Sequence, residues 1–349
     1  MTGATVRTAE RRPAESEHLF EVTDLRVAFR RGQTEAVAVD GVSYHLDPGE
    51  TLVLLGESGS GKSVSSLASM GLLDPPPAVA VSGSVRLAGR ELLGLDDAAG
   101  SLVRGKQIAM VFQDSLSALN PCYTIGFQII EVLRTHLGMS KRAARAHAID
   151  LLNRVRIPDA ARRVDDYPHQ FSGGQRQRVM IAIAIAAEPE VLIADEPTTA
   201  LDVTVQAEIM DLLADLQVER RMGMLLITHD LGVAADVADR IAVMYAGRIV
   251  EQSPAEAIYA GAAHPYTRGL LASVPRFDLP RGALAPIPGA PPSAGAFPAG
   301  CRFHPRCPLA TELCRQQEPA LLPVPGFERA SGPVRRSACH YADEVAGVR

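Results

Sequence analysis

The sequence predicts an α/β fold with a largely parallel sheet, and three observations lead to this prediction. Between residues 191 and 245 apolar strands alternate with helical segments, which is typical of parallel strands joined by crossover helices. The apolar run at 51–55 leads directly into a glycine-rich loop and then a helical segment at 64–72. Alternating runs between residues 19 and 47 predict short antiparallel strands before this unit.

The remaining elements follow from apolar periodicity. A further strand pair is expected at 83–87 and 107–112, and helical spacing of Ile125, Ile129 and Leu133 predicts helix across 121–156. The later elements are expected as strands at 191–194, 224–228 and 240–245 and helices at 203–221 and 231–238. From about residue 254 the composition shifts toward Pro, Gly, Ala and Cys, which indicates a separate tail.

Length and composition limit the function classes. A chain of 349 residues suggests two or three domains, and 47% hydrophobic with 21% charged residues is ordinary for a globular protein. The net charge of −5 leaves no basic excess for coating nucleic acid. No apolar stretch approaches the roughly 18–20 residues of a spanning helix, and the polar residues 1–17 lack a signal region. We expect a disordered lead at 1–17 and a cytosolic chain that reaches a membrane only through a partner.

The glycine-rich loop has the pattern of a phosphate-binding loop. It consists of Gly56, Glu57, Ser58, Gly59, Ser60, Gly61, Lys62 and Ser63. Its glycines let successive backbone amides point at phosphate oxygens, while Lys62 reaches the outer phosphates and Ser63 binds Mg²⁺. The following helix adds unpaired amides and the positive end of its dipole. A plain Gly/Ser turn is the alternative, but a strand before and a helix after favour a nucleoside triphosphate site with Mg²⁺.

Two further motifs carry chemistry. The apolar strand at 191–194 ends in Asp195 and Glu196; beside a phosphate loop the first acid can hold the Mg²⁺ shell and the second can polarise an attacking water. An acidic turn is the alternative. A second glycine motif lies at the start of an expected helix and comprises Ser172, Gly173, Gly174 and Gln175. Such a helix start can bind an anion, and a merely flexible helix start is the alternative.

With these motifs in this order, residues 19–253 resemble the ATP-binding subunit of an ABC transporter. The resemblance implies a P-loop NTPase core: a mixed sheet with an antiparallel β subdomain and a helical subdomain at about 114–170, the part that couples to a permease. It identifies Gln113 as the Q-loop residue, Asp202 as part of the D-loop and His229 as the switch histidine. The signature begins with Phe171 where leucine is usual, and Thr199 stands where serine is common.

The resemblance also implies a mechanism shared between two subunits. ATP bound at the phosphate loop of one subunit is capped by Ser172 and Gly174 of the other, and closure drives the transmembrane gate. The implied catalytic residues are Glu196 as general base, His229 at the γ-phosphate, Lys62 and Gln113. The implied Mg²⁺ ligands are Ser63, Gln113 and Asp195. Phe29 is expected to stack on adenine; Phe20, Tyr44 and a simple packing role for Phe29 are the alternatives.

The C-terminal tail indicates which subfamily of ABC transporter ATPases the chain resembles. Segments 264–271, 287–292 and 300–308 resemble the C-terminal extension of oligopeptide/dipeptide importer ATPases, a subfamily that includes nickel importers. This implies ATP-driven peptide uptake with a paralogous ATPase in a heterodimer, two permease subunits and an extracytoplasmic binding protein, peripheral at the cytoplasmic face of the plasma membrane. The alternatives are a nickel or other small-solute importer and a soluble ABC-type ATPase acting on DNA or ribosomes. A single phosphate loop without heptads disfavours the soluble factor.

The expected division is therefore a lead at 1–17, a nucleotide-binding domain at 18–253 and an extension at 254–349. Four of the five cysteines lie in this extension, at Cys301, Cys307, Cys314 and Cys339. A cytosolic Cys₄ set favours metal or redox chemistry, and four thiolates suit Zn²⁺ or a [4Fe–4S] cluster. The spacing lacks the CxxC pairs of zinc ribbons, and the resemblance implies the iron–sulfur cluster; unliganded thiols are the alternative.

Overall fold

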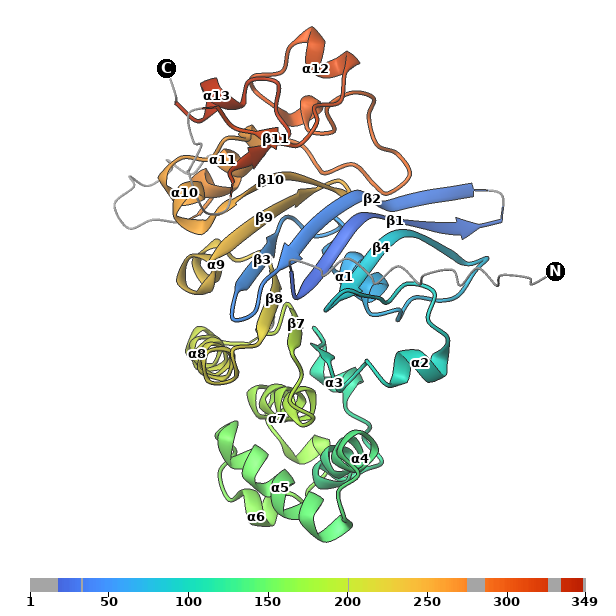
Figure 1. The fold of residues 1–349 in the computed structure, drawn as a ribbon. Coiled ribbons are helices and arrows are strands. Elements are labelled where there is room, and N and C mark those ends of the chain that lie inside the picture. The colour runs from blue at the N-terminus through green and yellow to red at the C-terminus, as the bar shows by residue number, and fades with distance from the viewer. Residues whose placement is uncertain (1–17, 33, 200, 275–285, 326–333, 348–349) are drawn as a thin grey trace, which may run out of the picture.

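The computed structural model describes residues 18–347 except 33, 200, 275–285 and 326–333. The expected N-terminal lead at 1–17 lies outside the described residues. Figure 1 shows a helical part at one end, two sheets in the middle and the C-terminal extension at the other end. Among the described helices, none has the length and apolar character that crossing a membrane requires.

The antiparallel sheet precedes and flanks the phosphate loop. Its strand order is β2-β1-β4-β5, and its members are β1 (Phe20–Arg31), β2 (Thr34–Leu46), β4 (Val79–Leu87) and β5 (Arg90–Glu91). The expectation of short strands here was wrong, since β1 and β2 have 12 and 13 residues. Register shifts interrupt the β1–β2 pairing between Val22 and Leu25 and again before Val27. Such bulges break the alternation of side chains and make one long strand look like several short ones.

The second sheet has eight strands in the order β11-β12-β10-β9-β3-β8-β7-β6. Its parallel strands are β3 (Thr51–Leu55), β6 (Ile108–Val111), β7 (Val191–Asp195), β8 (Gly223–Thr228) and β9 (Arg240–Tyr245). All their residues are buried, as expected of a parallel sheet covered on both faces. The largely parallel sheet is therefore confirmed. The expected pairing of 83–87 with 107–112 was wrong, because β4 and β6 belong to different sheets.

Helices cover this sheet and extend beyond it. Those of the core are α1 (Lys62–Ser69), α2 (Asp97–Ser101), α7 (Gly173–Ile185), α8 (Val203–Arg220) and α9 (Leu231–Val237). The helical part contains α3 (Ser115–Ala118), α4 (Ile125–Leu137), α5 (Lys141–Arg154), α6 (Ala160–Arg163) and the short η1 (Pro168–Gln170). On α4 the predicted face is fully buried at Ile125, Ile129 and Leu133.

The C-terminal extension packs onto the core instead of forming a separate tail. Its elements are α10 (Ala255–Ala260), α11 (Pro265–Ala272), η2 (His304–Arg306), α12 (Glu312–Gln316), β11 (Leu322–Pro323), β12 (Arg336–Ser337) and α13 (Ala342–Val345). Strand β12 pairs with β10 (Arg248–Pro254), so the extension continues the large sheet. The rings of Tyr266 and Phe303 pack against Tyr245 of β9, with centroids 4.6 and 5.3 Å away.

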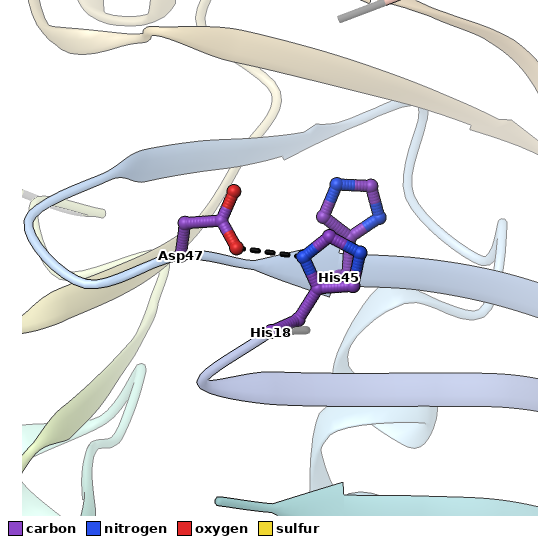
Figure 2. Close-up of side chains that lie close together, drawn as sticks. All are labelled: His18, His45 and Asp47. Atoms are coloured by element: carbon purple, nitrogen blue, oxygen red, sulfur yellow. Dashed lines mark hydrogen bonds and ion pairs between the residues drawn. The ribbon is translucent and has the colours of Figure 1, made fainter. Parts of the chain in front are cut away.

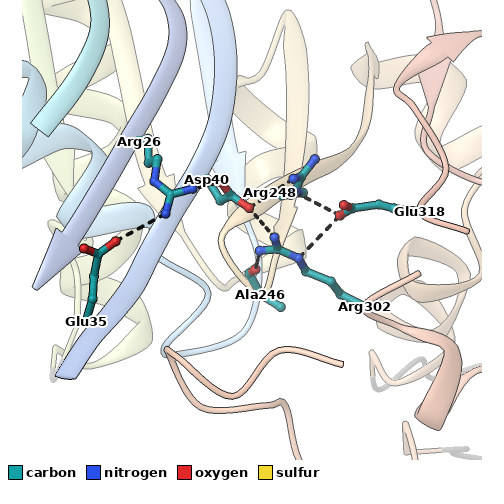
Figure 3. A network of polar contacts seen from close by, with 7 residues as sticks. All are labelled: Arg26, Glu35, Asp40, Ala246, Arg248, Arg302 and Glu318. Atoms are coloured by element: carbon teal, nitrogen blue, oxygen red, sulfur yellow. Dashed lines mark hydrogen bonds and ion pairs between the residues drawn. The ribbon is translucent and has the colours of Figure 1, made fainter. Parts of the chain in front are cut away.

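A charged network also ties the extension to the antiparallel sheet (Figure 3). Asp40 of β2 accepts hydrogen bonds from Arg302 of the extension and, at 3.0 Å, from Arg248 of β10. Glu318 lies 2.9 Å from Arg248 and 3.4 Å from Arg302. Burial by itself would raise the pKa of Asp40, but the two guanidinium groups lower it. The carboxylate of Asp40 is thus held ionised between two sheets and the extension.

Candidate nucleotide-binding site

The phosphate loop connects β3 to α1 and takes a shape that only glycine permits at two points. Gly61 has a φ of +103°, and a Cβ there would lie 2.6 Å from the carbonyl oxygen of Ala38. A Cβ on Gly56 would lie 2.2 Å from the carbonyl oxygen of Met244. The backbone therefore approaches its neighbours more closely than a side chain allows. The helix begins at Lys62, two residues earlier than predicted, so its free amides lie at the loop itself.

Lys62 is buried and bends back over this loop. Its Nζ donates to the carbonyl oxygen of Gly56 at 2.7 Å and to that of Glu57 at 3.0 Å. Burial lowers the pKa of Lys62, while the nearby carboxylates of Glu196, Asp195 and Glu57 act in the opposite direction. The amine thus lies among acidic groups at the mouth of the loop.

Ser63 and Asp195 form a pair of oxygen donors next to the loop. Ser63 Oγ donates to Asp195 Oδ1 at 3.0 Å, and Asp195 is buried at the end of β7. Burial raises the pKa of Asp195, and the adjacent Glu196 adds to this effect. A hydroxyl and a carboxylate beside a phosphate loop are the oxygen ligands that Mg²⁺ uses in nucleotide sites. These residues fit the predicted Mg²⁺ site.

Glu196 lies at the centre of a cluster of polar side chains. Gln113 Nε2 and Thr199 Oγ1 each donate to its Oε2 at 2.9 Å, and His229 Nδ1 lies 3.3 Å from its Oε1. Glu196 has a φ of +44°, and its N–H donates to the carbonyl oxygen of Ile227 at 2.9 Å. This positive φ is uncommon for a non-glycine residue, and such strain is concentrated at functional sites. The sequence showed Thr199 only as a departure from the serine that is common at this position, and the contact of Thr199 with Glu196 was not predicted.

These groups share one cavity of about 720 Å³. Its walls include the phosphate loop, Gln113, Glu196 and His229. The extension contributes Leu270, Ser273, Pro286 and Ile287. The contribution of the extension to this cavity was not predicted, because the motif at 287–292 indicates the subfamily but not a contact with the phosphate loop.

Three predicted binding elements lie outside this cavity. Phe29, on β1 opposite Ala36, is 36% exposed and is not part of the cavity wall. Ser172 caps α7, where its Oγ accepts from the N–H of Gln175 at 3.3 Å. Asp202 caps α8 by accepting from the N–H of Val205 at 3.0 Å. The adenine contact of Phe29 and the nucleotide contacts of the two caps remain predictions.

The four cysteines of the extension surround one small cavity together. Their thiols are free, and the Cys301 N–H donates to the carbonyl oxygen of Cys314 at 2.8 Å. Burial raises the pKa of Cys301 to about 11 and that of Cys339 to about 12. Cys122 is exposed and lies outside this cavity. The chain thus brings together residues that are 38 positions apart at their extremes, Cys301 and Cys339.

Among the described residues, the group of possible ligands whose donor atoms all lie within 4.8 Å of one another is His18, His45 and Asp47 (Figure 2), and the four cysteines are not spaced this closely. His18 Nδ1 lies 2.7 Å from Asp47 Oδ1, and the two imidazole rings stack with centroids 3.7 Å apart. Burial and the neighbouring Arg240 lower the pKa of His45 to about 4. Because the two imidazole rings are stacked, their nitrogens lie in nearly parallel planes. The nearby Arg240 guanidinium would also repel a cation bound there.

Comparisons with known proteins agree with this geometry. The profile of the family described as ABC transporter matches residues 39–199, and that of the oligopeptide/dipeptide transporter C-terminal region matches residues 250–314. The dipeptide transport ATP-binding protein DppD of Escherichia coli is 49% identical over 329 residues, which are 94% of this chain and 98% of that protein. The oligopeptide transport ATP-binding protein OppD of Mycobacterium tuberculosis is 53% identical over 315 residues. The chain spans about half (51%) of the length of that relative.

Solved structures show the same fold. A dimeric ATP-binding cassette, MJ0796, bound to ADP and Pi is 29% identical, with a TM-score of 0.61 over 68% of this chain and 98% of that one. CbiO1 from Clostridium perfringens is 26% identical, with a TM-score of 0.59 over 70% of this chain and 92% of that one. On the profiles and the identities together, the chain belongs to the ABC transporter family of ATP- and Mg²⁺-binding proteins, in the group with the oligopeptide/dipeptide transporter C-terminal region.

Proposed function

We propose that this chain is the ATP-hydrolysing subunit of a membrane importer for dipeptides or oligopeptides. The observation that carries the proposal is the cluster around Glu196, which lies in the same cavity as the phosphate loop and the Ser63–Asp195 pair. The names of the relatives from E. coli and M. tuberculosis support the peptide cargo. A nickel or other small-solute importer is the alternative, and no relative named above supports it.

The proposed reaction is attack of water on the γ-phosphorus of ATP. Glu196 takes a proton from the water as its oxygen forms a bond to phosphorus, and the bond to the β–γ bridging oxygen breaks to release ADP and phosphate. Gln113 and Thr199 hold the carboxylate of Glu196 in place through one oxygen. His229 and Lys62 bind the γ-phosphate oxygens. Ser63, Asp195 and Gln113 would hold Mg²⁺, which would supply positive charge for the negative charge that develops on the phosphates.

We propose that two such subunits complete each other's sites. Ser172 and its glycines lie at the start of α7, outside the cavity of their own chain, so they are free to cap ATP on a partner subunit. The dimeric cassette among the similar structures supports this arrangement. In the proposed complex the partner is a paralogous ATP-binding subunit. Two permease subunits and an extracytoplasmic binding protein complete the assembly at the cytoplasmic membrane face, and Phe29 stacks on adenine.

A test of this function is the Glu196→Gln variant, measured as ATP hydrolysis in the assembled transporter. Loss of a general base should lower kcat by roughly 10²–10⁴-fold, while ATP binding persists and the ATP-bound dimer accumulates. Glu190→Gln is the matched control, since this exposed carboxylate lies at the opposite end of β7. Wild-type turnover in Glu196→Gln would refute the assigned role.

We also propose that Cys301, Cys307, Cys314 and Cys339 hold a [4Fe–4S] cluster. Two observations support this proposal: the four free cysteines line the same cavity, and four cysteine thiolates are a ligand set that suits an iron–sulfur cluster. Zn²⁺ is the competing occupant. Anaerobically purified protein should be brown and carry about four iron atoms per chain, and Cys314→Ser should lose them. Colourless protein with zinc and no iron would exclude the cluster.

The proposed domain division is a lead at 1–17, a nucleotide-binding domain at 18–253 with its helical subdomain at 114–170, and the extension at 254–349. The two profile matches, at 39–199 and 250–314, support a boundary near residue 250. Limited proteolysis with and without ATP tests the division, and cleavage that falls mainly inside 18–253 would argue against it.

A further inference from the structure

Among the described residues, the hydrogen bonds between the C-terminal extension and the phosphate loop converge on Glu57. The guanidinium of Arg306 meets its carboxylate with two hydrogen bonds, Nη1 to Oε2 at 2.6 Å and Nη2 to Oε1 at 3.0 Å. The Arg306 side chain is only 5% exposed, and its Nε donates to the carbonyl oxygen of Pro288 at 2.9 Å. A two-bond arginine–carboxylate pair is among the most strongly oriented polar contacts in proteins. The side chain of Glu57 therefore has one fixed position.

The extension holds the backbone of the same residue. The Glu57 N–H donates to the hydroxyl of Tyr266 at 2.9 Å. Tyr266 is fully buried on α11, and its ring packs against Phe303, with centroids 5.3 Å apart. Both contacts with Glu57 thus come from the C-terminal extension, more than 200 residues further along the chain.

Charge makes this contact matter for nucleotide binding. Glu57 is the second residue of a loop that must receive a triphosphate, and Lys62 donates to its carbonyl oxygen at 3.0 Å. An unpaired carboxylate in this place would repel the phosphates and attract the lysine away from them. Arg306 neutralises that carboxylate and keeps it turned toward the extension.

The position of Arg306 in turn depends on the cysteine segment. Arg306 ends η2 and is followed directly by Cys307, while Cys301 lies just before this turn. The N–H groups of Arg306 and Cys307 donate to the carbonyl oxygens of Phe303 and His304, at 3.0 and 3.3 Å. The guanidinium is thus carried on a tight turn flanked by two of the four cysteines, so a change at those cysteines would reach it through this turn.

We propose that Arg306 is a positioning residue of the nucleotide site. Through Glu57 it holds the phosphate loop ready for ATP, and it makes nucleotide affinity depend on the four-cysteine segment. The second half of this statement rests on the proposed metal centre of that segment. By reciprocity, nucleotide binding stabilises the segment in return.

The first experiment measures the Kd of the full chain for a fluorescent ATP analogue (mant-ATP) with Mg²⁺. Arg306→Met should weaken binding by about tenfold or more, the size expected for loss of a charge-assisted pair. Arg302→Met is the matched control: the Arg302 side chain lies in the same segment and is 10% exposed against 5% for Arg306, but it pairs with Asp40 and not with the loop. Its Kd should stay within about threefold of the wild-type value, since it leaves Glu57 paired. An unchanged Kd in Arg306→Met, or an equal loss in both variants, would overturn the proposal.

Neutralising Glu57 separates this role from a general loss of structure. In the double variant Glu57→Gln with Arg306→Met the repelling charge is gone, so affinity should recover part of the loss. Absence of any recovery would show that Arg306 does not act through Glu57. If Arg306→Met folds poorly, Arg306→Lys replaces it. Lysine keeps the charge but not the paired geometry, so an intermediate Kd supports the proposal and a wild-type Kd contradicts it.

The link to the cysteines needs a separate measurement. Cys301→Ser should lower iron content and weaken mant-ATP binding in the wild-type background, with no further weakening in Arg306→Met. Lost iron with an unchanged Kd would refute the link while leaving the metal centre and the ATPase proposals intact. Protein without iron in any variant would refute the metal centre alone, and the Arg306→Met result would still decide the role of Arg306.

Discussion

Replacing Glu251 tests how firmly the extension is anchored. Glu251 lies on β10 with no solvent exposure, and its carboxylate accepts the N–H groups of Ala263 at 2.7 Å and His264 at 3.0 Å. Arg335 of the extension lies 3.3 Å away and is 3% exposed. The two amides lead into α11, which carries Tyr266 to the phosphate loop. The Glu251 carboxylate therefore helps to position α11, whose Tyr266 contacts the phosphate loop.

The expected cost of Glu251→Ala is large because the partner cannot lose its charge. Breaking a buried ion pair by removing one member typically costs about 3–5 kcal/mol, and a guanidinium stays protonated. Arg335→Met should behave differently, since the remaining carboxyl can bind a proton. Burial already raises the pKa of Glu251, so its folded-state pKa lies above the unfolded one. Stability in Arg335→Met should therefore be best at low pH and fall as pH rises through that folded pKa.

The assay is urea unfolding followed by circular dichroism between pH 5 and pH 8. Glu251→Ala should lose about 3–5 kcal/mol of unfolding free energy across this range, and Arg335→Met should lose less at pH 5 than at pH 8. The control is Glu312→Ala, which breaks an exposed pair with Arg315 at 3.2 Å and should cost less than about 1 kcal/mol. A loss in Glu251→Ala no larger than in this control would refute the reasoning.

Three further results are expected. Gly61→Ala should abolish mant-ATP binding, because its Cβ would meet the Ala38 carbonyl oxygen at 2.6 Å. The pKa of His45 is lowered to about 4 in the folded protein, so the wild type should lose stability as the pH falls from 6.5 to 4. His45→Asn lacks this titration, and its Tm should fall less over the same range. A Tm–pH profile identical to that of the wild type would contradict this. Ser172→Ala should lower unfolding free energy by about 1 kcal/mol in urea through loss of its cap, whereas Ser172→Asp should retain it.

The grouping of the candidate site residues in one cavity was predictable because most of them are close together in sequence. The loop from Gly56 to Ser63 and the Asp195–Glu196 pair each follow one strand directly, and parallel strands place their carboxyl ends at one sheet edge. The structure brings Gln113 and His229 to that edge as well, at the ends of β6 and β8. Strand order alone therefore assembles most of this cavity.

The contacts of the extension could not be predicted in the same way. Arg306 and Glu57 are 249 positions apart, and no periodicity links an arginine in a turn to an acid in a loop. The contact of Thr199 with Glu196 depends on the positive φ of Glu196, which no pattern of side chains indicates. Long strands were missed where bulges shift the register of β1. In each case the missing information is tertiary geometry and not residue type.

In the part of the extension that the structure describes, three arginines meet carboxylates elsewhere in the fold: Arg302 with Asp40, Arg306 with Glu57 and Arg335 with Glu251. All three arginine side chains are at most 10% exposed. Buried pairs contribute little net stability compared with apolar contacts of the same volume, since removing two charges from water costs about as much as their attraction returns. Their geometry, however, tolerates little displacement. Apolar side chains would hold the extension to the core at least as strongly as these ion pairs. The three pairs are therefore better suited to fixing the position of the extension relative to the phosphate loop.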